Sequence, residues 1–109
     1  MIMSQTQPFD LFIDGAFVQA ASGEQFTVTS PVDGSDYAVV AKAGIEDVDR
    51  AAAAAHRAFA GEWPRLLPFD RGRLLQKIAD GIRARAEEIA TVETMSGGKT
   101  ISNSLNEVE

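Results

Sequence analysis

The chain has 109 residues, the size of one small domain, and folding at that length buries roughly 60–65 % of the unfolded chain's surface. Sixteen acidic against ten basic residues give a net charge of -6, which argues against a nucleic-acid partner. The absence of cysteine excludes disulfides, thiolate metal sites and a cysteine nucleophile within the chain.

The start of the chain has no features of a targeting segment. Residues 1–7 lack the basic start and the apolar run of a signal peptide, and no run approaches the ~20 apolar residues that span a bilayer. We therefore expect a cytoplasmic protein with no membrane partner. We also expect a disordered tail over residues 1–10 and a domain that occupies residues 11–109.

Residues 11–18 predict a β-hairpin, because Asp14-Gly15 supplies the positive φ values of a type I′ turn between two apolar pairs. Further strands are predicted over residues 25–30 and 37–41, with a bend at Ser22-Gly23 and a turn at Asp33-Gly34. Three or four short antiparallel strands result, which are too few to form a core unaided.

A first helix is predicted after Gly44. The acidic residues Glu46, Asp47 and Asp49 favour a helix N-terminus through the helix dipole. Apolar residues then recur at helical spacing and form one face: Val48, Ala51, Ala52, Ala55 and Phe59. The pairs Trp63-Pro64 and Leu67-Pro68 interrupt the pattern, because a residue before proline is driven out of the α region.

A second helical region is predicted from Pro68, which suits the first turn of a helix. Gly81 predicts a bend between residues 81 and 86, and Gly97 or Gly98 fits a left-handed C-cap. Ile101 and Leu105 predict the opening of another helix. The region carries a long apolar stripe: Leu74, Leu75, Ile78, Ala79, Ile82, Ala86, Ile89 and Ala90. Short strands followed by long helices indicate an α+β fold whose sheet and stripe need partners.

The stretch from Glu93 to Thr100 ends in Gly98-Lys99-Thr100, as a phosphate-binding P-loop does. A P-loop has another glycine five positions before Gly98, where this chain has Glu93. It also needs a strand that enters the loop, so that backbone N–H groups converge on the phosphates. The residues before this stretch have helical spacing, and we interpret the stretch as a helix end.

No catalytic constellation is recognisable. A G-x-G-x-x-G fingerprint is absent, because Gly97-Gly98 follows a helix and lacks a third glycine at the right spacing. His56, the single histidine, is expected to be a partly exposed helix residue without an acid–base role. Ser96, Ser102 and Ser104 have no identifiable base to activate them. We assign no catalytic, cofactor-binding or metal-binding residue.

The acidic pairs and the aromatic residues are predicted to be structural. Glu46-Asp47, Glu87-Glu88 and Glu107/Glu109 are expected to be solvated surface, since adjacent helix residues do not face each other. Trp63 and the six phenylalanines are expected to lie in the core, because no positive charge accompanies them as in a nucleic-acid stacking platform.

Taken in order, these segments resemble the N-terminal part of the NAD(P)-dependent aldehyde dehydrogenase superfamily, from about Leu11 to Glu109. Each block is weak alone, whereas their order and spacing together are highly specific. The blocks are Phe12-Ile13-Asp14-Gly15, Ser30-Pro31…Gly34 (usually Asn-Pro and Thr-Gly in the family), Glu46-Asp47-Val48-Asp49-Arg50-Ala51, the Trp63 loop, Arg71-Gly72-Arg73-Leu74-Leu75 and Glu93-Thr94-Met95-Ser96-Gly97-Gly98-Lys99.

The resemblance implies an α/β enzyme several times longer, in which this region begins the cofactor-binding domain. Members oxidise aldehydes by attack of a cysteine thiolate, hydride transfer to NAD or NADP, and hydrolysis by a glutamate-activated water. An asparagine and backbone N–H groups hold the oxyanion. All these groups lie downstream of the matched region, so none is transferred to this chain.

The same resemblance implies an aldehyde substrate, NAD or NADP and a homo-oligomeric state for the parent enzyme. It predicts that the chain alone is inactive, binds no cofactor and needs the remainder of the fold as its partner. Some members also hold a structural monovalent cation near the positions of Val28, Thr29 and Ser96. Val28 and Ser96 replace the usual hydroxyl and carboxylate here, and we do not assign that site.

Three hypotheses therefore stand. The first is a truncated or incompletely sequenced aldehyde dehydrogenase, which the sequence beyond Glu109 would test. The second is a non-enzymatic interaction module that docks a partner protein through the helix stripe of residues 71–95. The third is a nucleotide-binding P-loop protein, which ATP-dependent thermal stabilisation would support.

Overall fold

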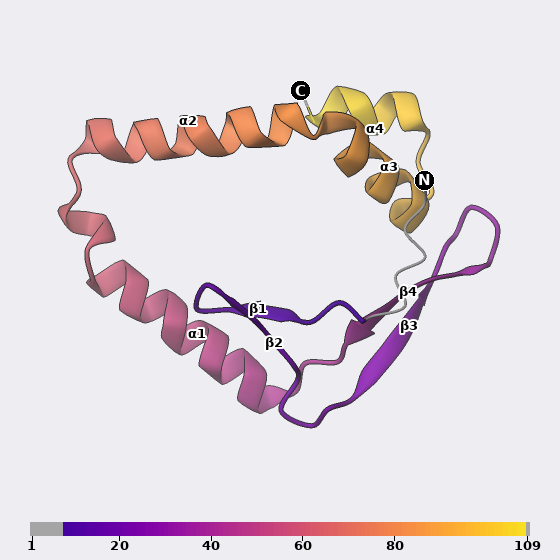
Figure 1. Ribbon diagram of the computed structural model, residues 1–109, viewed down its shortest axis with the longest axis horizontal. Helices are drawn as coiled ribbons and strands as arrows, with labels where there is room; N and C mark the ends of the chain where they lie inside the picture. The colour runs from indigo at the N-terminus through magenta and orange to yellow at the C-terminus, as the bar shows by residue number, and fades with distance from the viewer. Residues whose placement is uncertain (1–7, 109) are drawn as a thin grey trace. The chain divides into compact units, whose positions relative to one another are not determined.

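The computed structural model describes residues 8–108, in which two β-ribbons are followed by four α-helices (Figure 1). This order confirms the α+β prediction. The described residues divide into two compact units, one built from residues 8–28 with 38–65 and the other from residues 29–37 with 66–108. No helix among the described residues is long and apolar enough to cross a bilayer.

The predicted hairpin is formed by β1 (Leu11–Ile13) and β2 (Ala16–Val18). Asp14 has φ 55° and Gly15 has φ 79°, the two left-handed residues that a type I′ turn requires. The rings of Phe12 and Phe17 meet edge-to-face across the ribbon, with centroids 5.1 Å apart. The strands pair antiparallel in the register Leu11–Val18, Phe12–Phe17 and Ile13–Ala16.

The second ribbon consists of β3 (Gln25–Thr29) and β4 (Asp36–Ala41). Its strands are joined through the predicted turn, where Gly34 has φ 76°. In the described part of the chain the strands thus form two separate two-stranded sheets. Ribbons of this size are marginal by themselves, and their stability depends on the helices that they contact.

The predicted disordered tail over residues 1–10 is only partly open to comparison. Residues 1–7 lie outside the described residues, and the prediction stands untested there. Phe9 is already ordered, because it forms a parallel bridge with Val40. The Phe9 N–H donates to Val39 O at 2.8 Å, and its carbonyl accepts from the Ala41 N–H at 2.8 Å.

Helix α1 (Ile45–Ala60) begins after an extended Gly44, as predicted, and ends before the short 3-10 helix η1 (Trp63–Arg65). The apolar face expected from the helical spacing is exposed in α1. Val48 and Phe59 are 59 % and 73 % exposed, and the three alanines of that face are exposed too. The buried residues of α1 are Asp47 and Ala54, and Asp47 accepts hydrogen bonds from the backbone N–H groups of Ala21 and Gly44.

The second unit contains α2 (Pro68–Ala84), α3 (Ala86–Gly97) and α4 (Ile101–Val108). Arg85, with φ -118° and ψ 22°, interrupts the helix within the predicted bend region. Gly98 is the left-handed C-cap of α3, with φ 75°, and its N–H donates to Thr94 O. Helix α4 confirms the prediction from Ile101 and Leu105, and it packs against α3 (Figure 1).

The core of the described chain is small and is made of small side chains. Ala20, Ala54 and Ala90 are its buried apolar residues. The prediction that Trp63 and the six phenylalanines lie in the core is wrong, because all seven are at least 40 % exposed. Large side chains need a facing surface to cover them, and the described residues do not provide that surface.

Candidate functional site

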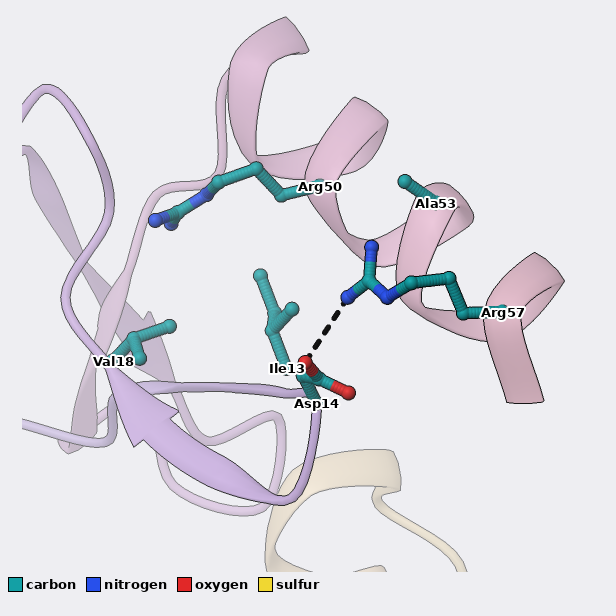
Figure 2. A pocket seen from close by; sticks show the side chains of 6 residues that line it. All are labelled: Ile13, Asp14, Val18, Arg50, Ala53 and Arg57. Atoms are coloured by element: carbon teal, nitrogen blue, oxygen red, sulfur yellow. Dashed lines mark hydrogen bonds and ion pairs between the residues drawn. The ribbon is translucent and has the colours of Figure 1, made fainter. Parts of the chain in front are cut away.

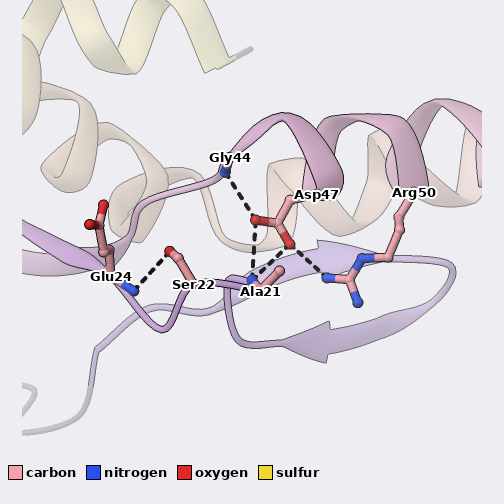
Figure 3. A network of polar contacts seen from close by, with 6 residues as sticks. All are labelled: Ala21, Ser22, Glu24, Gly44, Asp47 and Arg50. Carbon is pink, nitrogen blue, oxygen red and sulfur yellow. Dashed lines mark hydrogen bonds and ion pairs between the residues drawn. The ribbon is translucent and has the colours of Figure 1, made fainter.

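The carboxylate of Asp47 is the centre of the densest polar network in the first unit (Figure 3). Asp47 is the third residue of α1 and is only 1 % exposed. It accepts hydrogen bonds from the Ala21 N–H at 3.0 and 3.2 Å and from the Gly44 N–H at 3.0 Å. Arg50 Nη2 donates to it at 2.7 Å. One carboxylate therefore ties the loop around Ala21 to the start of α1.

This network keeps Asp47 ionised. The Gly44 N–H lowers the pKa of the carboxyl most, and Ala21 and Arg50 lower it further against the opposing effect of desolvation. The prediction that Glu46-Asp47 is solvated surface is thus wrong for Asp47. The sequence did contain a signal for this contact, because an acidic residue at the third helical position often accepts a hydrogen bond from the N–H of the N-cap residue. This motif, the capping box, was not recognised because glycine occupies the N-cap position, where serine or threonine is usual.

A surface pocket of ≈ 320 Å³ lies between the first hairpin and α1 (Figure 2). Arg57 Nη2 donates to Asp14 Oδ2 at 3.0 Å across it, and both side chains are more than 60 % exposed. The pocket is lined by Ile13, Asp14 and Val18 from the hairpin and by Arg50, Ala53 and Arg57 from α1.

The charges of this pocket are already balanced. Arg57 is paired with Asp14, and Arg50 is paired with Asp47 just outside the lining. An anion would have to compete with these carboxylates, and an exposed ion pair of this kind contributes little to either binding or stability. We assign the pocket no ligand.

The Glu93–Thr100 stretch is a joint between α3 and α4. Lys99 Nζ lies 2.6 Å from Glu107 Oε2 and 2.9 Å from Glu93 Oε1. Glu107 and then Glu93 raise the pKa of Lys99 through these hydrogen bonds. The interpretation of this stretch as a helix end is confirmed, since α3 stops at Gly97.

This joint does not suit a phosphate. The joint follows α3 instead of a strand, α4 begins only at Ile101, and the N–H of Gly98 already donates to Thr94 O. The amine of Lys99 already contacts two carboxylates. These residues therefore do not fit a nucleotide, including the NAD or NADP that the family resemblance implies.

A second polar contact ties the tip of the second ribbon to α3. Ser30 is fully buried, and its Oγ donates to Met95 O at 2.8 Å. The same oxygen accepts the Val32 N–H at 3.3 Å. The next residue, Pro31, lies so close to Gly98 that a Cβ on that glycine would be 3.1 Å from the proline Cγ.

The cation position of the family resemblance does not fit this chain either. Ser96, which stands where a carboxylate is usual, donates its hydroxyl to Val92 O at 2.8 Å within its own helix. The described residues contain no group of three acidic, histidine or cysteine side chains that could hold a metal ion.

The remaining polar residues considered from the sequence are not brought together. His56 lies exposed on α1. Ser104 is buried and shares a hydrogen bond of 2.9 Å with the Thr94 hydroxyl, which links α4 to α3. Ser102 Oγ lies 3.3 Å from Thr100 Oγ1. Each hydroxyl has a structural partner instead of a base.

The chain matches the model of the aldehyde dehydrogenase family over residues 17–109. It is 42 % identical over 99 residues to cytosolic 10-formyltetrahydrofolate dehydrogenase of Xenopus laevis, an overlap of 90 % of this chain and 11 % of that protein. It is 43 % identical over 96 residues to an aldehyde dehydrogenase of Aspergillus niger, which covers 88 % of this chain and 19 % of that protein.

The solved structures that the chain resembles are also aldehyde dehydrogenases. The NAD-dependent aldehyde dehydrogenase from Sinorhizobium meliloti superimposes with a TM-score of 0.88 at 39 % identity, over 94 % of this chain and 21 % of that one. Betaine aldehyde dehydrogenase from Staphylococcus aureus, solved with NAD+, gives 0.89 at 31 % identity, over 95 % and 21 %. The chain spans between 11 % and 21 % of the length of these relatives. It belongs to the aldehyde dehydrogenase family.

Proposed function

We propose that the chain forms the beginning of the cofactor-binding domain of an enzyme that oxidises an aldehyde to a carboxylic acid with NAD or NADP. The main support is the family match over residues 17–109. The fold agrees at 39 % identity with an enzyme named as an NAD-dependent aldehyde dehydrogenase. Agreement in sequence and fold along nine tenths of a chain favours common descent over a shared fold alone.

The proposed contribution of this chain is structural. The buried polar residues of the described chain are Ser30, Asp47 and Ser104, and the side chain of each hydrogen-bonds to another segment, to backbone groups for Ser30 and Asp47 and to the Thr94 hydroxyl for Ser104. The described residues bring together no nucleophile, base or phosphate cradle. The reacting groups and the cofactor contacts would then belong to the rest of the family fold, and the 109-residue chain would be inactive.

The test compares the complete open reading frame that contains this chain with the 109-residue chain alone. Both are purified and supplied with a panel of aldehydes and with either NAD or NADP, and reduced cofactor is followed by absorbance. We expect aldehyde-dependent reduction by the complete protein and none by the 109-residue chain.

Two results would contradict the proposal in different ways. A complete, folded protein that reduces neither cofactor with any aldehyde would reject the enzymatic function. Turnover by the 109-residue chain would reject the structural role assigned to it. A reading frame that stops after Glu109 and continues into unrelated sequence would exclude an intact parent.

A further inference from the structure

The dipeptide Asp-Gly occurs three times in the chain, each time in a different kind of structure. Asp14-Gly15 forms the tip of the first hairpin, Asp33-Gly34 lies in the turn of the second ribbon, and Asp80-Gly81 lies inside α2. Because glycine has no Cβ, its backbone nitrogen is easily reached by the side chain of the residue before it. Each dipeptide therefore has the groups needed for spontaneous isomerisation of aspartate to isoaspartate.

This reaction needs no partner other than water. The backbone nitrogen of the glycine bonds to Cγ of the aspartate, and one carboxyl oxygen leaves as water with the carboxyl proton and the proton of that nitrogen. Water then opens the cyclic imide at either carbonyl, which returns aspartate or gives isoaspartate, whose main chain runs through Cβ and Cγ. Overall no atom is gained or lost, and nothing is oxidised or reduced. Hydrogen bonds to the glycine N–H or to the carboxylate oppose ring closure, because they must break first.

At Asp33-Gly34 both reacting groups are held within the second unit. The Gly34 N–H donates to Ser30 O at 2.9 Å. Asp33 Oδ1 accepts the Ser35 N–H at 3.0 Å and the Ser35 hydroxyl at 2.7 Å. The hydroxyl and then the N–H of Ser35 lower the pKa of Asp33, which keeps the carboxyl in its less reactive ionised form. Ring closure here would break the hydrogen bonds that define the turn.

At Asp80-Gly81 the helix holds the same two groups. Gly81 is an interior residue of α2, where its N–H belongs to the backbone hydrogen bonds of the helix. Asp80 Oδ1 accepts hydrogen bonds from Gln76 Nε2 at 3.0 Å and from Arg83 Nη1 at 3.3 Å. The Cα–Cβ bond of a helical residue also points toward the start of the helix, away from the next nitrogen. Ring closure would therefore require local unwinding of α2.

Asp14-Gly15 lacks most of these restraints. The hairpin pairs Ile13 with Ala16, and among the described residues the Gly15 N–H donates no hydrogen bond. Arg57 holds one carboxylate oxygen at 3.0 Å, in an ion pair whose side chains are both more than 60 % exposed (Figure 2). Asp14 also has a left-handed φ of 55°, and the strands beside it have only three residues each. Rotation of this peptide requires only fraying of the hairpin tip.

We propose that Asp14-Gly15 is the isomerisation site of this chain, and that Asp33 and Asp80 are protected by the contacts around them. The proposal is independent of the proposed function, because the reaction uses only groups of the chain and water. Isoaspartate adds one carbon to the main chain of a two-residue turn. It therefore disturbs the pairing of Ile13 with Ala16, whose register depends on the turn.

Incubation in heavy-oxygen water measures the reaction at each site, because every opening of the imide places a heavy oxygen in the residue that formed it. The folded 109-residue chain is incubated at neutral pH, and the chain unfolded in guanidinium chloride is the reference. Circular dichroism of a parallel sample checks that the first is folded. Cleavage after glutamate separates the three sites into residues 1–24, 25–46 and 63–87. Fragmentation in the mass spectrometer then locates the heavy oxygen within each peptide.

In the unfolded chain we expect the three sites to incorporate heavy oxygen at rates within about twofold of one another, because the reacting dipeptide is the same. In the folded chain we expect Asp14 to react at least about tenfold faster than Asp33 or Asp80, since these two react only after local opening. Similar rates at the three sites of the folded chain would overturn the proposal. A slower rate at Asp14 than at either of the others would overturn it too.

Ser35→Ala tests the cause of the protection. It removes the hydroxyl contact to Asp33 and leaves the first hairpin unchanged. We expect it to raise the rate of heavy-oxygen incorporation at Asp33 by about threefold or more, and at Asp14 by less than about twofold. An unchanged rate at Asp33 would refute the protective role of this contact.

Asp14→Glu tests the assignment of the site, because the longer side chain does not form the five-membered imide. We expect it to abolish incorporation of heavy oxygen in residues 1–24. Asp10→Glu is the matched control in the same peptide and should leave the rate unchanged. Persistent incorporation in the Asp14→Glu variant would place the reaction at another residue and overturn the assignment.

Discussion

The hydroxyl of Ser30 donates a hydrogen bond to the main-chain carbonyl of Met95 at 2.8 Å, which joins positions 65 residues apart. Ser30 is fully buried, and its oxygen also accepts the N–H of Val32. One small side chain thus satisfies two backbone groups where the ribbon tip meets the last turn of α3. Buried backbone groups without a partner are costly, so this contact is a specific determinant of the junction.

We expect Ser30→Ala to destabilise the chain by about 1–3 kcal/mol, because it leaves the partly buried Met95 carbonyl without its donor. Urea unfolding followed by circular dichroism measures the change. Ser35→Ala is the matched control, since Ser35 bonds to Asp33 at an exposed turn, and it should change stability by less than about 0.5 kcal/mol. A loss for Ser30→Ala as small as that expected for Ser35→Ala would show that the Ser30 contact is dispensable.

Gly98 and Gly97 should respond oppositely to alanine. Gly98→Ala forces a left-handed φ of 75° on a residue with a Cβ and sets that Cβ 3.1 Å from Pro31, so we expect a loss of about 1–2 kcal/mol. Gly97 has only Glu93 Oε1 at 3.8 Å from its position, and alanine there should be neutral or stabilise by up to about 1 kcal/mol. The same urea titration compares the two, and a more stable Gly98→Ala variant would contradict the assigned C-cap.

Asp47 predicts an acid-sensitive component of stability. Its folded-state pKa lies below the unfolded value of about 3.9, so its stabilisation is complete above that value and is lost as pH falls through the folded-state pKa. We expect Asp47→Asn to lower the melting temperature near neutral pH and to approach the unsubstituted chain at strongly acidic pH. Asp49→Asn, at an exposed position, controls for the loss of one negative charge. Parallel melting curves at all pH values would refute the role of the network.

The joint at Lys99 predicts that ATP with magnesium does not stabilise the chain. The amine is held by Glu93 and Glu107, and the adjacent glycines lie at the negative end of α3. A thermal melt with magnesium ATP should match a melt in sodium chloride of equal ionic strength. A saturable rise in melting temperature specific to ATP would restore the P-loop hypothesis.

Local sequence rules predicted the turns and the boundaries of the helices. Asp14-Gly15, Gly34 and Gly98 adopt the positive φ values expected of them, because that conformation is a property of a few adjacent residues. The α1 helix ends ahead of Trp63-Pro64, and α2 begins at Pro68. These boundaries are local too, because proline keeps the residue before it out of the α region. The absence of cysteine and the net charge were likewise fully determined by composition.

Burial depended on tertiary structure. The aromatic residues expected in the core are exposed, whereas Ser30, Asp47 and Ser104 are the largest fully buried side chains. The hydrophobicity of a side chain indicates whether its burial is favourable. Whether it is buried depends on a surface that packs against it. Asp47 and Ser30 are buried because backbone groups 26 and 65 positions away come within hydrogen-bond distance. Those separations follow from the fold and from no local pattern, so the sequence by itself specified the elements while the tertiary structure selected the residues that join them.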